Sequence, residues 1–120
     1  MSGGNGRDPG GDRDAEELAA PVGLVDLVRG VLGELADVSR IDGDDGAVWQ
    51  RAGQPFASLA AGALEVRLQP AVARAALRTP DTSSSPRGEG WVRFAPSALD
   101  RFAADRAAAW LESAWRHAAD

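Results

Sequence analysis

A short run of alternating residues, LEVRLQ at positions 64–69, constrains the fold of this chain more than any other stretch. Apolar side chains alternate there with polar ones, in the order Leu64, Glu65, Val66, Arg67, Leu68 and Gln69. Because successive side chains of a β-strand point to opposite faces, the pattern predicts a strand with one apolar and one polar face. Such strands are typical of antiparallel sheets that are covered on one side only.

Four other segments also have the character of strands. VSRIDGDDGAVWQR (38–51) predicts two short strands around a turn at Asp42–Gly46, where Asp and Gly provide the turn chemistry. QPFASL (54–59) predicts a further strand, joined to the alternating run near Ala61 and Gly62. Residues 79–90 have the composition of a loop, and the strand WVRFA (91–95) follows it.

Three helices complete the expected secondary structure. The first has an apolar stripe at three- and four-residue spacing, formed by Leu24, Leu27, Val28, Val31, Leu32 and Leu35. PAVARAALR (70–78) opens with Pro70 and predicts a short helix. Ser97 is the expected N-cap of the last helix, with Asp100 three residues later. The expected apolar face of that helix consists of Leu99, Phe102, Ala103, Trp110, Leu111 and Ala114.

The expected order of elements is therefore α-β-β-β-β-α-β-α. Short connections between strands favour an α+β two-layer sandwich, with a mostly antiparallel sheet and helices on one face only. The length of 120 residues suits one domain, which we assign to residues 15–120. Residues 1–14 contain almost nothing apolar, so we expect a disordered tail there.

Composition limits the classes of function. The chain has no cysteine, which excludes disulfides, thiolate metal sites and a cysteine nucleophile. No apolar run approaches the roughly 18 residues of a membrane span, and the first residues lack the apolar core of a signal peptide. We therefore expect a soluble, cytoplasmic protein that does not bind membranes. Residues 1–46 carry a net charge of −7 and residues 47–120 a net charge of +2, so a nucleic-acid footprint is expected only in the second part.

The polar face of the sheet is the candidate binding face. If Leu64, Val66, Val92 and Phe94 face the helices, the neighbours of these residues face the other way. Six residues are predicted on that open face: Trp49, Arg51, Glu65, Arg67, Trp91 and Arg93. Aromatic residues and arginines are enriched in binding hot spots, and a guanidinium stacks favourably on an indole ring. The alternative is that these side chains only stack across strands and cover the sheet.

We identify no catalytic residue, no cofactor site and no metal site. His117 is the only histidine and lies near the C-terminus, where a surface position is expected, and no Gly-rich phosphate loop follows a strand. The turn at Asp42–Gly46 lacks the ligand spacing of a calcium loop. A metal site made of carboxylates alone is an alternative, although Arg29 and Arg40 lie among the carboxylates and would repel a cation. Its candidate ligands are Asp26, Glu34, Asp37, Asp42, Asp44 and Asp45.

Four short motifs, in order, resemble the MmcQ/YjbR family. They are GQPFASL (53–59), LEVRLQP (64–70), GWVRF (90–94) and LESAW (111–115), and the resemblance covers about residues 24–118. The so-called luciferase-like domains of unknown function have a similar pattern. The resemblance implies a small α+β fold with a frataxin-like shape and a DNA-binding label. The family's Lys in its GKxFA motif is Gln54 here, whereas Arg67 keeps the other basic position.

These observations lead to a functional expectation. We expect a small, non-enzymatic binding or interaction module that acts through the open sheet face. The alternative is a nucleic-acid-binding protein that uses Arg51, Arg67, Arg93 and Arg87. Two tryptophans on the open face would expose a large apolar area, which predicts a homodimer through that face. Another protein or a small ligand could cover it instead.

Overall fold

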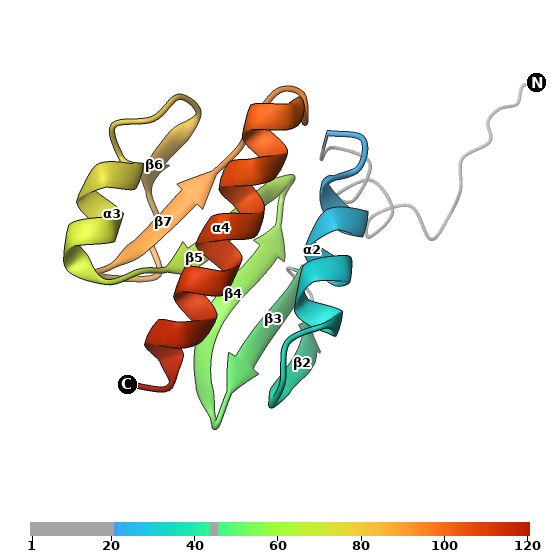
Figure 1. Ribbon diagram of the computed structural model, residues 1–120, viewed down its shortest axis with the longest axis vertical. Coiled ribbons are helices and arrows are strands. Elements are labelled where there is room, and N and C mark those ends of the chain that lie inside the picture. The colour runs from blue at the N-terminus through green and yellow to red at the C-terminus, as the bar shows by residue number, and fades with distance from the viewer. Residues whose placement is uncertain (1–20, 44–45) are drawn as a thin grey trace, which may run out of the picture.

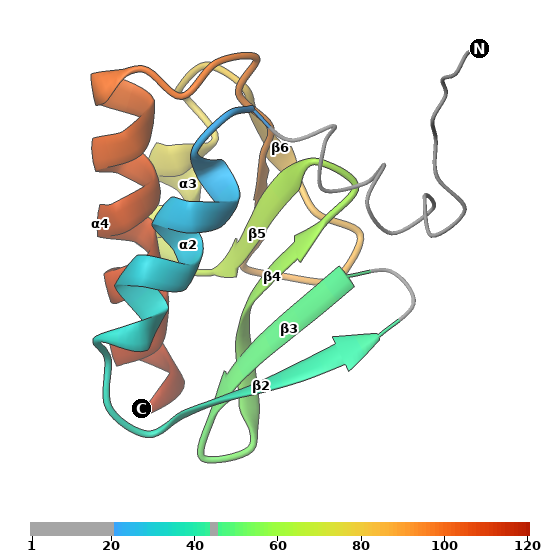
Figure 2. The same cartoon turned by 90° about the vertical axis from the view of Figure 1, so that its right-hand side faces the viewer.

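The computed structural model describes residues 21–43 and 46–120, and this part of the chain forms an antiparallel six-stranded sheet with three helices on one face (Figures 1 and 2). The elements are α2 (Leu24–Gly33), β2 (Val38–Gly43), β3 (Gly46–Arg51), β4 (Gln54–Ala60), β5 (Ala63–Arg67), α3 (Pro70–Ala76), β6 (Thr82–Ser84), β7 (Trp91–Phe94) and α4 (Arg101–Ala118). The α+β two-layer sandwich expected from the sequence is confirmed. The predicted tail and the start of the predicted domain lie outside the described residues.

The strands follow the order β2-β3-β4-β5-β7-β6 across the sheet. Two-residue turns connect β3 to β4 and β4 to β5. Both residues of each turn have positive φ: 53° at Ala52 and 80° at Gly53, then 52° at Ala61 and 77° at Gly62. Positive φ at both central positions defines the type I′ turn, whose twist matches that of the strands it joins. These turns fix the register of the three central strands.

Strand β6 lies inside the segment expected to be a loop. Its backbone pairs with β7, with Thr82 opposite Phe94 and Ser84 opposite Val92. The hydroxyl of Thr82 donates to the carbonyl of Ala76 at 2.8 Å, which ties the end of α3 to this strand. Three Ser and Thr residues carry no apolar alternation, so the pattern that predicts the other strands is missing here.

The core lies between the helices and the inner face of the sheet. Helix α4 crosses β4 and β5 and lies beside α2 (Figure 1). The rings of Phe94 and Trp110 meet edge to face, with centroids 5.2 Å apart. Phe102, expected on the apolar face of α4, is 69% exposed, because it lies one residue away from the buried stripe that begins at Ala103. Within the described ranges, no helix has both the length and the apolar character needed to span a membrane.

The N-cap of α4 is Asp100 and not Ser97. The carboxylate of Asp100 accepts a hydrogen bond from the backbone N–H of Ala103 at 2.8 Å. We expect Asp100→Ala to lower the free energy of unfolding by about 1 kcal/mol, because the first turn loses its acceptor. Ser97→Ala is the control and should change it by under about 0.5 kcal/mol. Urea unfolding of both variants measures the difference, and equal losses would contradict the assignment of the cap.

Candidate functional site

The register of the sheet assigns each candidate residue to a face. Trp49 pairs with Ala57, Ala57 with Val66, and Val66 with Val92, so these four side chains share one face. That face is the one under the helices, since Val66 and Val92 are buried in the core. Trp49 is only 5% exposed and belongs to the same core. The prediction that Trp49 lies on the open face is therefore wrong.

Arg51 is also on the helix side. Its guanidinium lies 3.9 Å from the centroid of the Trp115 ring, and its Nη1 donates to the carbonyl oxygen of Trp115 at 3.0 Å. Trp115 in turn donates from Nε1 to the carbonyl of Ala36 at 2.8 Å. Arg51 thus fastens the end of β3 to α4, and the prediction that it contributes to an open binding face is wrong.

The other four candidate residues lie on the open face. Glu65 is directly opposite Arg93, and Arg67 is directly opposite Trp91, on the adjacent strands β5 and β7. The intervening residues Leu64, Val66, Val92 and Phe94 are buried on the helix side. The alternation of these two strands therefore predicted correctly which side chains share the open face.

A loop covers part of this face, which the sequence did not indicate. Residues 85–90 connect β6 to β7 on the side of the sheet away from the helices (Figure 2). Ser85 Oγ donates to Glu65 Oε2 at 2.7 Å, and Arg87 Nε donates to Glu65 Oε1 at 2.8 Å. Arg87 Nη2 also donates to Ser58 Oγ at 3.0 Å. Glu65 is left 8% exposed, so it anchors the loop and is not an accessible contact residue.

Because the Glu65 carboxylate holds the loop, it does not pair with the arginines of the neighbouring strand positions. Both oxygens of Glu65 already accept hydrogen bonds, and no ion pair or hydrogen bond to Arg93 or Arg67 is found in the part of the chain that the structure describes. Arg87 lies 5.4 Å from the centroid of the Trp91 ring. We call Arg67, Arg87, Trp91 and Arg93 the Arg–Trp face. This face therefore carries three arginines and one half-buried tryptophan.

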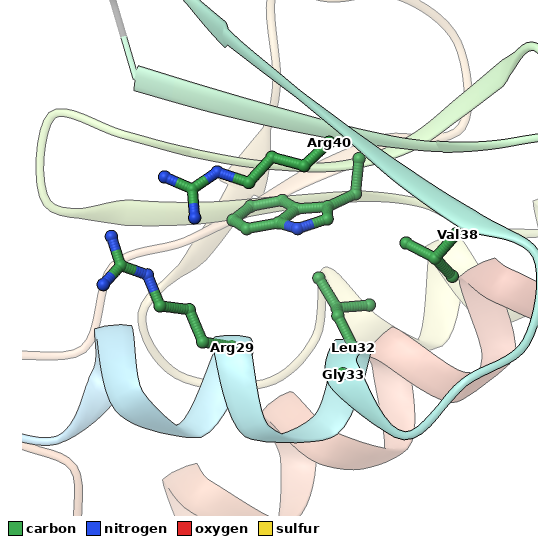
Figure 3. Close-up of a pocket in the computed structure, with 6 residues that line it drawn as sticks. Arg29, Leu32, Gly33, Val38 and Arg40 are labelled. Carbon is green, nitrogen blue, oxygen red and sulfur yellow. The ribbon is translucent and has the colours of Figure 1, made fainter.

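A groove on the opposite side of the sheet is a second candidate site. It has a volume of about 280 Å³ and lies between α2 and the strands β2 and β3. Its lining consists of Arg29, Leu32, Gly33, Val38, Arg40 and Trp49. The guanidinium of Arg40 is 5.7 Å from the centroid of the Trp49 ring, and its Nε donates to Asp42 Oδ1 at 2.7 Å. Figure 3 shows the guanidinium ends of Arg29 and Arg40 at the same end of the groove.

Neither site carries an obvious catalytic set. Nδ1 of His117 lies 3.6 Å from Asp120 Oδ2 at the C-terminal end of α4, away from both sites. Over residues 21–43 and 46–120, no three His, Cys, Asp or Glu side chains are grouped as metal ligands would be. Asp44 and Asp45, two of the carboxylates considered for a metal, lie outside the described residues.

Comparisons with protein-family models, with curated proteins and with solved structures find no match for this chain. The resemblance to the MmcQ/YjbR family therefore stays a prediction. The structure places its two informative positions: Gln54 is exposed at the start of β4, and Arg67 lies at the end of β5 within the Arg–Trp face.

Proposed function

We propose that this protein is a non-enzymatic binding module whose Arg–Trp face receives acidic groups of a partner. One observation carries the proposal: Arg67 and Arg93 have no ion-pair partner among the described residues, although Glu65 lies directly opposite Arg93. Both arginines project from strands of a sheet whose other side is packed on helices. A guanidinium in such a position offers planar donors that match a carboxylate or a phosphate.

The position of Glu65 supports a role for the arginines outside the fold. Cross-strand neighbours of opposite charge normally stabilise a sheet by pairing with each other. Here Arg87 and Ser85 occupy the carboxylate, so Arg93 contributes little to the sheet through its charge. Trp91 is the cross-strand neighbour of Arg67, lies 5.4 Å from the Arg87 guanidinium and adds apolar contact area. Arginine and tryptophan together are the residues that most often dominate binding energy at interfaces.

Nucleic-acid binding is a second candidate, favoured by the indole among the arginines. Single-stranded nucleic acids are bound by a basic groove in which bases stack on aromatic side chains. Arg51 does not contribute to this function, because it packs on Trp115. The arginines that support it are therefore Arg67, Arg87 and Arg93. The net charge of the whole chain is −5, which opposes long-range attraction to phosphates. We therefore rank this function second.

The homodimer predicted from the sequence stays a prediction, but fewer residues now support it. Trp49 is in the core and adds no apolar area to the open face. Glu65 of a second copy is also not accessible to Arg67 or Arg93 across such an interface, because Glu65 is buried under the loop. Only Trp91 and its arginines are left to form such an interface. Native mass spectrometry of the purified protein reports the oligomer, and any bound metal or metabolite, in one measurement.

A charge-matched pair of variants tests the proposed function. We expect the double variant R67Q/R93Q to bind a fluorescein-labelled oligoglutamate peptide at least about tenfold more weakly than the wild type in an anisotropy titration. The control R74Q/R78Q removes the same charge from exposed positions in and after α3, and should stay within about twofold of the wild type. Equal weakening in both variants would show a general charge effect and refute the site.

A single-stranded oligonucleotide in the same titration separates the two functions. Phosphate contacts make the logarithm of the affinity fall linearly with the logarithm of the salt concentration. A steep fall for the oligonucleotide, with binding lost in R67Q/R93Q and in Trp91→Ala, would favour the nucleic-acid function. Absence of oligonucleotide binding even at low salt would exclude it.

A further inference from the structure

Strand β2 forms one edge of the six-stranded sheet (Figure 1). Within the described residues it pairs with β3 alone, so one row of its backbone N–H and C=O groups has no strand partner. The opposite edge, β6, has only three residues, whereas β2 has six, of which five are exposed. A long and accessible edge of this kind is a template for pairing with another strand.

The edge lacks most of the features that normally prevent such pairing. Natural sheets protect long edges with Pro, Lys, a β-bulge or a covering segment. Strand β2 contains neither Pro nor Lys, and its register with β3 is continuous from Val38 to Gly43. The strand runs away from the helix layer toward Gly43 (Figure 2). Ile41, near the middle of the strand, is 52% exposed and provides an apolar contact surface.

The two charged residues of β2 have opposite signs and flank Ile41. Arg40 Nε and Asp42 Oδ1 form an ion pair at 2.7 Å, with side chains 36% and 54% exposed. Charged side chains on an edge strand deter pairing when they bring like charges together. Here each strand presents a neutral pair, so a second copy of the strand meets no net repulsion from it. Pairing does not require Arg40 to leave Asp42.

The same charges select one register for two antiparallel copies of β2. Residues opposite each other in an antiparallel pair turn their N–H and C=O groups both toward each other or both away. Across a two-fold axis a residue can therefore lie opposite itself but not opposite its neighbour in sequence. Two such registers pair five residues of each strand, one centred on Arg40 and one on Ile41. The first puts Arg40 opposite Arg40, which is destabilising, whereas the second puts Arg40 of each copy opposite Asp42 of the other.

We propose that β2 is the interface of a homodimer, in which a second copy of the chain pairs antiparallel along this edge with Ile41 opposite Ile41. The interface is isologous, because the same residues contribute from both copies. Arg40 and Asp42 lie on the helix side of the strand, since Arg40 is opposite the core residue Trp49. The two ion pairs would form a square of alternating charges there, and the two Ile41 side chains would meet on the other face.

This interface differs from a dimer through the open sheet face and does not depend on the proposed function. It includes no residue of the Arg–Trp face, which lies on β5, β7 and the loop before β7. A two-fold axis perpendicular to the sheet keeps the open faces of both copies on the same side. At about 4.8 Å per strand, the dimer would present two Arg–Trp faces roughly 40 Å apart. An extended acidic partner that reaches both would bind with avidity.

Sedimentation of the full chain over a range of concentrations tests the proposal. A single strand pair is a small interface, so we expect a dimer with a Kd of about 0.1 mM or tighter at physiological salt. Ile41→Lys should weaken the dimer at least about tenfold, because it brings two like charges together at the centre. Phe102→Lys is the matched control: it also replaces an exposed apolar side chain, 69% exposed on α4, and should stay within about twofold of the wild type.

Charge exchange between the two strands tests the register. R40D and D42R should each weaken self-association at least about tenfold, because all the charges of each variant's edge then have one sign. The double variant R40D/D42R restores opposite signs and should dimerise within about threefold of the wild type. An equimolar mixture of R40D and D42R should form a heterodimer, since every charge of one then lies opposite its complement on the other. Circular dichroism of each variant verifies that the exposed replacements leave the fold intact.

Three results would each overturn the proposal. A wild type that is monomeric at about 1 mM leaves the edge to a strand of another protein. A dimer that is lost in Trp91→Ala but kept in Ile41→Lys places the interface on the open sheet face. A mixture of R40D and D42R without heterodimer excludes the register centred on Ile41. R67Q/R93Q should dimerise as the wild type does, so failure of this interface and failure of the Arg–Trp face are distinguishable.

Discussion

Trp49→Ala is expected to lower the free energy of unfolding by about 3–5 kcal/mol, whereas Trp91→Ala should lower it by only about 1 kcal/mol. Trp49 is 5% exposed and packs in the core below α2, so truncation removes buried apolar area and leaves a cavity. Trp91 is half-buried on the open face, where water can replace its contacts. The two residues were expected to lie on the same face, so this contrast tests the corrected assignment directly.

Urea unfolding monitored by far-ultraviolet circular dichroism measures both free energies. The m-value should be unchanged in Trp91→Ala, because this replacement alters little of the surface exposed on unfolding. Trp49→Phe is the matched control for size, since it keeps an aromatic ring in the core. We expect it to lose less than half as much free energy as the alanine variant. Equal losses for Trp49→Ala and Trp91→Ala would contradict the placement of Trp49 in the core.

Most of the fold could be predicted from local patterns. The alternation at residues 64–68 predicted which side chains of β5 face the helices and which face away. The alternation at Trp91–Phe94 did the same for β7. The turn after β4 lies at Ala61 and Gly62, where the sequence predicted that the strands reverse. These features depend only on neighbouring residues, which is why they can be recognised without the structure.

Strand β3 shows where such reasoning fails. Its sequence offers an apolar side chain to each face, with Val48 on one side and Trp49 on the other. Parity alone cannot decide which of the two is turned inward. The structure turns Trp49 toward α2, which buries the larger side chain and leaves Val48 only partly covered. Arg51 follows Trp49 to the helix side, where Trp115 provides a ring on which its guanidinium stacks.

The candidate sites were only partly predictable for a related reason. Glu65, Arg67, Trp91 and Arg93 were assigned to one face from alternation, and they lie there. Arg87 belongs to a loop with no periodic pattern, so nothing in the sequence indicated that it reaches Glu65 and Ser58. The groove at Trp49 requires the relative placement of α2 and β2, which are separated by a short irregular connection. Such tertiary arrangements have no local signal.

The carboxylate that anchors the loop provides the last prediction. Glu65→Ala is expected to lower the free energy of unfolding by about 2–4 kcal/mol, because Arg87 and Ser85 lose the carboxylate that accepts their hydrogen bonds. The Arg87 side chain is 33% exposed, so water stabilises the freed guanidinium in part, and we expect a smaller loss than for a fully buried pair. Urea unfolding of the variant measures the loss.

The pair formed by Glu112 and Arg116 is the internal control. Its charged atoms are 3.7 Å apart on the surface of α4, with side chains 54% and 65% exposed, so Glu112→Ala should cost under about 0.5 kcal/mol. A double-mutant cycle of Glu65→Ala with Arg87→Ala isolates the direct interaction, for which we expect a coupling of about 1–2 kcal/mol. If Glu65→Ala costs no more than Glu112→Ala, the loop is not held by this carboxylate. Glu65 would then be available to pair with Arg93, and the Arg–Trp face would lose the excess positive charge on which the proposed function rests.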